Sequence, residues 1–216
     1  MSMARREHNS LWKNDFLFLG NQLALDFLNT HLVQNSESLE LLSDFRAVLR
    51  WFRAANLLRS GEAKILQRQW GKSARARRTA EAMRELREKL RRETLAWERG
   101  RAIRRSTVDE LNGLMEQHPM RNMLKASGGR SSTELYFEPR QPEDLFAPLA
   151  HSAAELFASV DRNRVRKCEH CVAHFYDSSK KGNRRWCSMQ LCGNRAKVAA
   201  YATRQRLRRS RITKRS

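Results

Sequence analysis

The sequence predicts a mainly α-helical fold with a small β-hairpin, an α+β protein, followed by a separate small cysteine-rich module at the C-terminus. Three observations carry this prediction. Apolar side chains recur at helical spacing through much of the first 160 residues. One Gly-Gly pair divides two short runs of extended character. All four cysteines of the 216-residue chain lie within residues 168–192. We therefore expect two domains, residues 1–160 and residues 161–216.

The first elements are short. Residues 16–19 form an apolar run that ends at Gly20 and predicts a buried strand. Residues 22–32 have helical spacing. Three polar side chains share one face of this segment: Asp26, Asn29 and Thr30. They are candidates either to bind a small effector or to tie the helix to neighbouring backbone through buried hydrogen bonds, and we favour the second role.

Two longer helical segments follow. Ser43 is the expected N-cap of a helix that has Asp44 in its first turn and ends at residues 56–61. Its apolar stripe comprises Phe45, Val48, Leu49 and Phe52. Residues 62–99 are strongly helical, with one interruption near residues 71–73. Their apolar stripe comprises Met83, Leu86, Leu90 and Trp97, and their charged pairs one turn apart are Glu85 with Lys89 and Glu88 with Arg92. Such pairs indicate a solvated face, with a nucleic-acid or dimer contact as the alternative.

A further helix is expected to begin at a capping box. Ser106 is its expected N-cap, Asp109 takes the place of the usual Glu, and the helix extends to about Gln117.

The next segment changes character. Within residues 120–138, two extended runs flank the Gly128-Gly129 pair, which predicts the β-hairpin. Three prolines then mark a linker: Pro139, Pro142 and Pro148. Pro148 also suits the first turn of a helix that continues to Val160 and leads into the cysteine module.

Positive charge is concentrated at the C-terminus. The chain has a net charge of +20, and residues 162–216 hold 17 Lys and Arg against 2 Asp and Glu. A field of one sign on a quarter of the chain suits a phosphate-binding surface, because each neutralised phosphate releases condensed counterions. A solubilising tail is the alternative. The charge therefore points first to nucleic acid.

Two close cysteine pairs satisfy the needs of a tetrahedral zinc ion. The four candidate ligands are Cys168, Cys171, Cys187 and Cys192. Each pair can bind one edge of the ion, and the loop between the pairs can bring the two edges together. Four thiolates complete the coordination, so we expect neither His170 nor His174 to be a ligand. One structural zinc ion would then hold the module together without performing chemistry. Phe175, Trp186 and Val165 are the expected apolar cover of the metal.

The segment after the last cysteine predicts a basic helix. It is rich in helix formers, lacks proline and should continue to about Arg209. A basic helix anchored on a zinc module can enter the DNA major groove or follow phosphates. The candidate nucleic-acid-binding residues are Arg184, Arg185, Arg195, Lys197, Arg204, Arg206, Arg208 and Arg209.

These residues resemble two known domains. The resemblance to the CGNR zinc finger rests on Cys168, Cys171, Phe175, Asp177, Ser179, Arg185, Trp186, Cys187, Ser188, Met189, Cys192, Gly193, Asn194, Arg195, Lys197, Tyr201 and Arg204. Residues 18–20 and 23–30, with Leu42, Leu49 and Trp51, are similar to the ABATE domain. Asn21 stands where that pattern has a second glycine.

The resemblance implies a class of protein. It indicates a bacterial stress-induced transcription regulator, with a helical ABATE domain ahead of a treble-clef-like zinc-finger module that binds DNA. Such a protein is cytoplasmic and associates with the nucleoid when bound. The resemblance names neither a target sequence nor an effector.

Other function classes lack support in the sequence. The longest early apolar run has four residues, far below the roughly 20 that a spanning helix needs, so we expect no membrane partner. The front domain has no paired carboxylates, Ser/His/Asp set or phosphate loop, so we do not expect an enzyme. RNA remains open as the alternative partner of the zinc module. A homodimer and an unidentified effector of the front domain also remain open.

Overall fold

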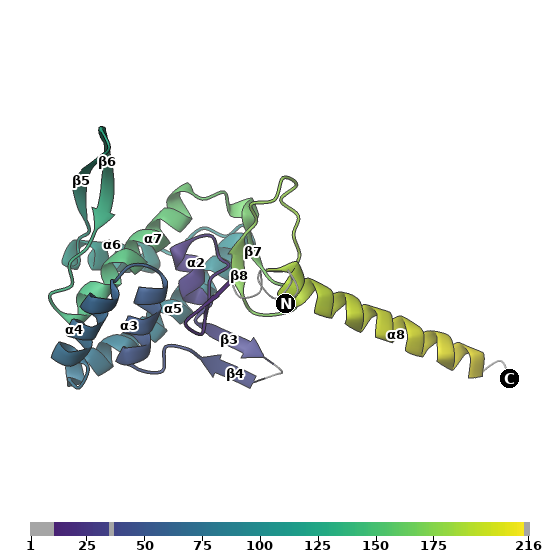
Figure 1. The fold of residues 1–216 in the computed structure, drawn as a ribbon. Helices are drawn as coiled ribbons and strands as arrows, with labels where there is room; N and C mark the ends of the chain where they lie inside the picture. Colours follow the sequence, from purple (N-terminus) through teal and green to yellow (C-terminus); the bar gives the residue numbers. More distant parts are fainter. Residues whose placement is uncertain (1–10, 35–36, 214–216) are drawn as a thin grey trace.

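The structure, a computed structural model, describes residues 11–34 and 37–213. Helices form the body of the molecule (Figure 1). A β-hairpin extends from one end of the body, and the C-terminal helix extends from the other end, away from all other elements. The helices are α2 Leu23–Leu28, α3 Phe45–Ala54, α4 Ser60–Trp70, α5 Ala74–Glu98, α6 Arg105–Gln117, α7 Phe146–Ser159 and α8 Asn194–Thr213. Shorter turns are η1 Pro142–Leu145, η2 Arg162–Arg164 and the π-helical η3 Met189–Gly193.

Within the described residues, the strands form four separate antiparallel pairs. They are β1 Trp12–Lys13 with β2 Phe16–Leu17, β3 His31–Gln34 with β4 Glu37–Glu40, β5 Arg121–Ser127 with β6 Arg130–Tyr136, and β7 Val165–Lys167 with β8 His174–Tyr176. The β5–β6 pair is the hairpin expected around the Gly-Gly pair, and Gly128 and Gly129 both have the positive φ that its turn requires. These elements confirm the mainly α fold with small β pairs.

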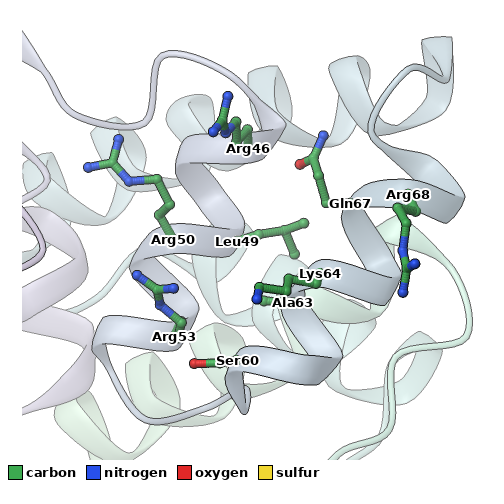
Figure 2. A pocket seen from close by; sticks show the side chains of 9 residues that line it. All are labelled: Arg46, Leu49, Arg50, Arg53, Ser60, Ala63, Lys64, Gln67 and Arg68. Atoms are coloured by element: carbon green, nitrogen blue, oxygen red, sulfur yellow. The ribbon is translucent and has the colours of Figure 1, made fainter.

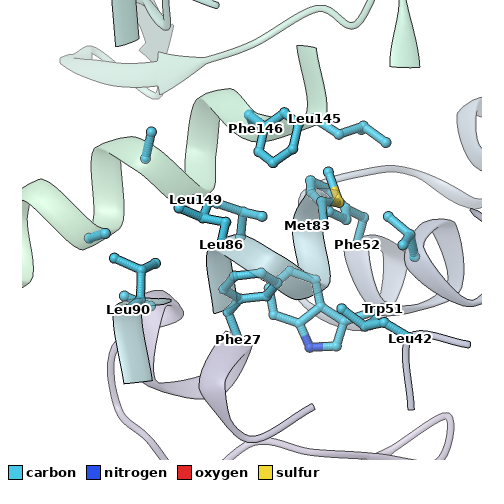
Figure 3. Close-up of a cluster of buried hydrophobic side chains, with 14 of the residues drawn as sticks. Phe27, Leu42, Trp51, Phe52, Met83, Leu86, Leu90, Leu145, Phe146 and Leu149 are labelled. Atoms are coloured by element: carbon cyan, nitrogen blue, oxygen red, sulfur yellow. The ribbon is translucent and has the colours of Figure 1, made fainter. Parts of the chain in front are cut away.

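Trp51 lies at the centre of the main core (Figure 3). Its ring is fully buried and lies 5.7 Å from that of Phe27 and 5.4 Å from that of Phe52. The expected α5 stripe packs into the same core, with Met83, Leu86, Leu90 and Trp97 all buried. Burying each such side chain stabilises the fold by about 1.5–3 kcal/mol, so α2, α3, α5 and α7 are held around one apolar centre.

Two helix starts differ from the sequence prediction. Asp44, not Ser43, is the N-cap of α3, and its carboxylate accepts a hydrogen bond from Ala47 N at 2.7 Å. Helix α6 starts without a side-chain cap at Arg105, so the expected capping box at Ser106 is wrong. Asp109 instead forms an ion pair with Arg105 at 2.8 Å.

The helix expected over residues 22–32 is shorter and is followed by a second hairpin. Helix α2 ends at Leu28, and Thr30 Oγ1 donates to Phe27 O, which satisfies a carbonyl of the last turn. The next residues enter β3, which pairs with β4. The helical prediction therefore continued too far.

The segment expected as a proline-marked linker belongs to the core. Pro142 is buried, and Leu145 and Phe146 belong to the main cluster. Asp144 accepts backbone hydrogen bonds from residues 140 and 141 and pairs with His118 at 2.9 Å. These bonds hold residues 139–148 against α6, so this segment does not separate two domains.

The charged residues of α5 pair differently from the sequence prediction. Lys89 pairs with Glu110 of α6, in place of the expected Glu85. Glu88 pairs with Arg87, Arg91 and His31, in place of the expected Arg92. A tertiary partner thus replaces the first expected pair, and Glu88 combines two partners within α5 with the tertiary partner His31.

Arg87 carries a buried charge whose loss should destabilise the fold. Its side chain is 2% exposed and contacts Glu40 at 2.5 Å and Thr30 Oγ1 at 3.1 Å. We expect Arg87→Met to lower the free energy of unfolding by about 2–3 kcal/mol, less than for a fully buried pair because Glu40 keeps some access to water. Denaturant unfolding measures this. The exposed pair of Arg105 and Asp109 is the control, and Arg105→Met should cost less than about 0.5 kcal/mol. Equal losses in both variants would contradict a role for burial.

Candidate metal centre and basic helix

The four cysteines come together from two local structures. Cys168 and Cys171 lie in the turn between β7 and β8, where Cys168 N donates to Ala173 O at 2.9 Å. Cys187 and Cys192 lie on either side of Ser188, whose Oγ accepts from Gln190 N at 3.2 Å and whose carbonyl accepts from Cys192 N at 3.0 Å. These hydrogen bonds shape the two cysteine-bearing turns, and a bond from Glu169 N to Arg185 O at 3.0 Å links one turn to the segment before the other.

The cluster fits one zinc ion. All four Sγ atoms lie within 4.8 Å of one another, with Sγ–Sγ separations of 3.8 Å for Cys171 to Cys187 and 3.6 Å for Cys187 to Cys192. A tetrahedron with Zn–S bonds of about 2.3 Å has edges of about 3.8 Å. The four cysteines therefore form a structural zinc site, as expected. The metal would supply cross-linking of the two turns, and the four thiolates leave no position for substrate.

The thiols need a cation to ionise together. Hydrogen bonding with Cys168 raises the pKa of Cys187 and of Cys192, since a further thiolate would lie against negative charge already in the cluster. A divalent ion removes that repulsion. Metal binding and full deprotonation of the cluster are thus linked.

Neither nearby histidine belongs to the cysteine cluster. His170 is exposed, whereas His174 is fully buried in β8. Burial lowers the pKa of His174 to about 3, so its ring is neutral at pH 7. Within the described residues, neither ring nitrogen of His174 has a hydrogen-bond partner.

His174→Leu should therefore preserve the fold. Removing a buried polar group that lacks partners costs little, so we expect unchanged zinc content and an equal or higher Tm at pH 7. The variant should also resist acid better. The unfolded chain binds a proton on His174 near pH 6.5 while the folded chain does not until about pH 3, so wild-type stability falls over that window as pH decreases. Thermal melting from pH 7 to pH 5 checks this. A lower zinc content in His174→Leu would contradict it.

The metal cover is shared with the front of the chain. The second buried cluster comprises Leu17, Leu19, Leu32, Cys168, Ala173, Phe175, Cys187, Leu191 and Cys192, with Trp186 packed against it. Phe175 and Trp186 thus cover the site as expected. Val165 belongs instead to the main core, because β7 faces that way. The three leucines come from β2, its following loop and β3, which the sequence did not connect with the finger.

Hydrogen bonds also join the two parts. Asn29 bonds the backbone of His174 in both directions, at 2.8 and 2.9 Å. Tyr176 N donates to Gly20 O at 2.9 Å. Asn21 has a φ of 55°, the left-handed conformation that explains why a glycine is expected there, and its side chain donates to Tyr176 O at 3.3 Å. Strand β8 is therefore fixed to the loop and helix that begin the front domain.

These contacts bear on the three candidate effector residues. Asn29 is occupied by His174, and Thr30 Oγ1 lies between Phe27 O and Arg87. Both are buried. Asp26 accepts hydrogen bonds from Leu19 N and Gly20 N at 2.9 and 2.7 Å, and burial raises its pKa to about 6. Of the three residues, Asp26 alone lines a cavity, so the structural role accounts for the trio better than a shared effector site.

Helix α8 is pinned at its start and exposed beyond it. Its first residues follow the π-helical turn that holds Cys192. A Cβ on Gly193 would lie 2.5 Å from the Met189 sulfur and 3.3 Å from the Trp186 ring, so the glycine permits close packing at this junction. The helix then leaves the body (Figure 1). Arg195, Lys197, Arg204 and Arg206 are exposed, whereas Arg208 and Arg209 lie in the helix with side chains outside the described part.

The two other candidate arginines are partly engaged in the finger. Arg184 lies over the Phe175 ring at 4.9 Å and donates to Cys187 O, so it supports the cysteine turn. Arg185 is exposed and pairs with Glu169 at 2.6 Å. A hollow of 330 Å³ lies at the base of α8. Two of the candidate nucleic-acid-binding residues line it, Arg185 and Lys197, together with four residues that were not among the candidates: Glu169, His170, Trp186 and Ala196. This hollow could not be predicted from the sequence, because it depends on how α8 packs against the finger.

Two family models match the chain. Residues 21–160 match ABATE, described as "Putative stress-induced transcription regulator", and residues 164–205 match the CGNR zinc finger. Both resemblances are thereby confirmed. Neither description is that of an enzyme. A comparison with curated proteins gave no match. Within residues 11–34 and 37–213, no helix is long and apolar enough to span a membrane.

Proposed function

Because the chain belongs to the ABATE family and ends in a CGNR zinc finger, we propose that it is a DNA-binding transcription regulator. Residues 161–216 act as the DNA-binding module, and residues 1–160 position it. The protein then works at the nucleoid of a bacterial cytoplasm and performs no catalysis.

One observation carries the proposal. Helix α8 contains six Arg and one Lys but no Asp or Glu, and every described side chain from 197 to 204 is exposed. Like charges along a helix repel one another, so the bare helix is costly in the free protein. A polyanion relieves that repulsion. Twenty residues span about 30 Å at 1.5 Å per residue, and an α-helix fits the DNA major groove.

The zinc site gives α8 its direction. Cys192 and Gly193 lie in the turn that precedes the helix, so a bound metal fixes the first turn of α8 to the β7–β8 hairpin. A helix held rigidly at one end loses less conformational entropy on binding than a free segment does. The metal thus serves binding through position and not through chemistry.

Binding measured across salt tests the proposal. A 20-base-pair duplex titrated from 50 to 300 mM salt should show a log–log slope of about −4 to −7, because the contact releases counterions from each neutralised phosphate. A slope near zero would contradict the phosphate contacts and therefore the proposed function.

Two exposed side chains on α8 favour RNA as the second candidate. Tyr201 is 59% exposed and Val198 is 68% exposed, and an exposed aromatic ring can stack on an unpaired base. Competition between duplex DNA and single-stranded RNA of equal length separates the partners. Tighter duplex binding supports DNA, whereas an advantage for RNA that disappears in Tyr201→Ala would support the alternative.

A further inference from the structure

A cationic groove lies between α3 and α4, far from the zinc site. The cavity has a volume of about 630 Å³ and is lined by Arg46, Leu49, Arg50, Arg53, Ser60, Ala63, Lys64, Gln67 and Arg68. Figure 2 shows Arg46, Arg50 and Arg53 along α3 and Lys64 and Arg68 along α4. Five of the nine lining residues are cationic and none is acidic.

Among the described residues, one of the five groove cations has a carboxylate partner. Arg50 pairs with Asp15 at 2.6 Å, at a site where the aspartate side chain is 84% exposed. Within the described residues, Arg46, Arg53, Lys64 and Arg68 form no ion pair. Some arginines of the body, such as Arg87, are matched by carboxylates, here Glu40 and Glu88. The groove instead gathers five cations around one cavity with no acidic residue in its lining.

The groove also has an apolar floor and a hydrogen-bonding group. Leu49 is buried and points between the two helices, and Ala63 lies opposite it (Figure 2). Gln67 also lines the groove and supplies a side-chain amide. Small-molecule sites commonly have volumes of about 300–1,000 Å³ and combine an apolar surface with a few polar groups.

We propose that the α3–α4 groove binds a small organic polyanion, a molecule that carries two or more negative charges and an apolar part. The cations recognise the anionic groups, and arginines provide paired donors for phosphate or carboxylate oxygens. The apolar part packs on Leu49 and Ala63. Nucleic acid is a poorer occupant, because α3 and α4 lie at the end of the body opposite α8 (Figure 1). This proposal does not depend on DNA binding by α8.

Calorimetry on the full zinc-loaded chain tests the groove with three probes: ATP, inorganic pyrophosphate and hexanoate. ATP has both required features, pyrophosphate lacks the apolar part, and hexanoate lacks the second charge. At 0.15 M salt we expect ATP to bind at least fivefold more tightly than either of the others. No binding by ATP at millimolar concentration, or equal binding by pyrophosphate, would overturn the proposal.

Variants that remove positive charge test whether ATP binds in the α3–α4 groove. Arg46→Gln, Arg53→Gln and Lys64→Gln together should weaken ATP binding at least tenfold. The same loss of three charges on α8, through Arg195→Gln, Arg204→Gln and Arg206→Gln, should change it less than threefold. Equal losses of affinity in the two triple variants would show that ATP binding depends on net charge, and would overturn the proposed site in the groove.

A variant that fills the cavity distinguishes ATP binding inside a pocket from ATP binding to a charged surface. Ala63→Tyr keeps all five cations and places a ring in the cavity, so it should also weaken ATP binding at least tenfold while the Tm stays within a few degrees. An unchanged affinity for ATP in Ala63→Tyr would overturn the proposal that ATP binds inside the cavity. Displacement of ATP from the α8 triple variant by a 20-base-pair duplex would assign the groove to nucleic acid and overturn the small-molecule proposal.

Discussion

Removing zinc with a chelator should destabilise the front domain as well as the finger. Leu17, Leu19 and Leu32 are buried against the cysteine cluster, and each contributes about 1.5–3 kcal/mol through burial. Loss of the metal exposes these side chains, because the finger has little core of its own. The total is about 5–9 kcal/mol, so the Tm of the front domain should fall by at least about 10 °C.

The measurement is hydrogen exchange of α2 and α3 together with thermal melting, before and after chelation. Exchange in Leu23–Leu28 should accelerate, because Asn29 loses its two bonds to His174 when β8 unfolds. Cys187→Ser should reproduce the effect without a chelator, and the chelator should then have no further effect on that variant. Front-domain exchange and Tm that stay unchanged while the finger melts would show two independent domains, as the sequence alone suggested.

Neutralising the exposed basic residues at the start and middle of α8 should nearly abolish nucleic-acid binding. The variant replaces Arg195, Lys197, Arg204 and Arg206 with glutamine. Each phosphate contact contributes about 0.9 to the salt slope, so losing four should reduce the slope by about 3–4 and weaken binding about 10²- to 10³-fold at 0.15 M salt. The Tm should change little, since these four side chains are exposed and α8 extends away from the body (Figure 1). Fluorescence anisotropy of a labelled duplex measures both quantities.

A control with the same change in net charge distinguishes the helix from the overall field of the protein. Arg77, Arg78, Arg92 and Arg99 are exposed in α5 or at its end, and within the described residues they form no ion pair. Replacing all four with glutamine should weaken duplex binding less than about fivefold. If both quadruple variants lose equal affinity, binding depends on total charge and α8 has no special role.

The metal site could be predicted from the sequence because its ligands are close along the chain. Cys168 and Cys171 lie in one turn, and Cys187 and Cys192 lie in another. Four thiolate ligands are typical of a structural zinc site. Local spacing and ligand type were sufficient. The long amphipathic helices could be predicted for the same reason, since the α5 stripe follows a period that the sequence displays directly.

The features that could not be predicted from the sequence depend on tertiary contacts. Leu32 was placed at the end of a helix, yet it lies in β3 and packs toward the cysteines. Asp44 took the capping role from Ser43, a competition between neighbouring polar residues that propensity does not decide. The α3–α4 groove likewise escaped, because Arg46 and Lys64 become neighbours of one cavity only when two helices pack.

X-ray absorption at the zinc edge, with metal analysis of the purified chain, tests the central claim most directly. One ion held by four sulfurs would link the front domain, the finger and α8 at the point where they meet. We predict one zinc per chain with four sulfur neighbours at about 2.3 Å. Substoichiometric zinc, or nitrogen and oxygen neighbours in place of sulfur, would contradict it.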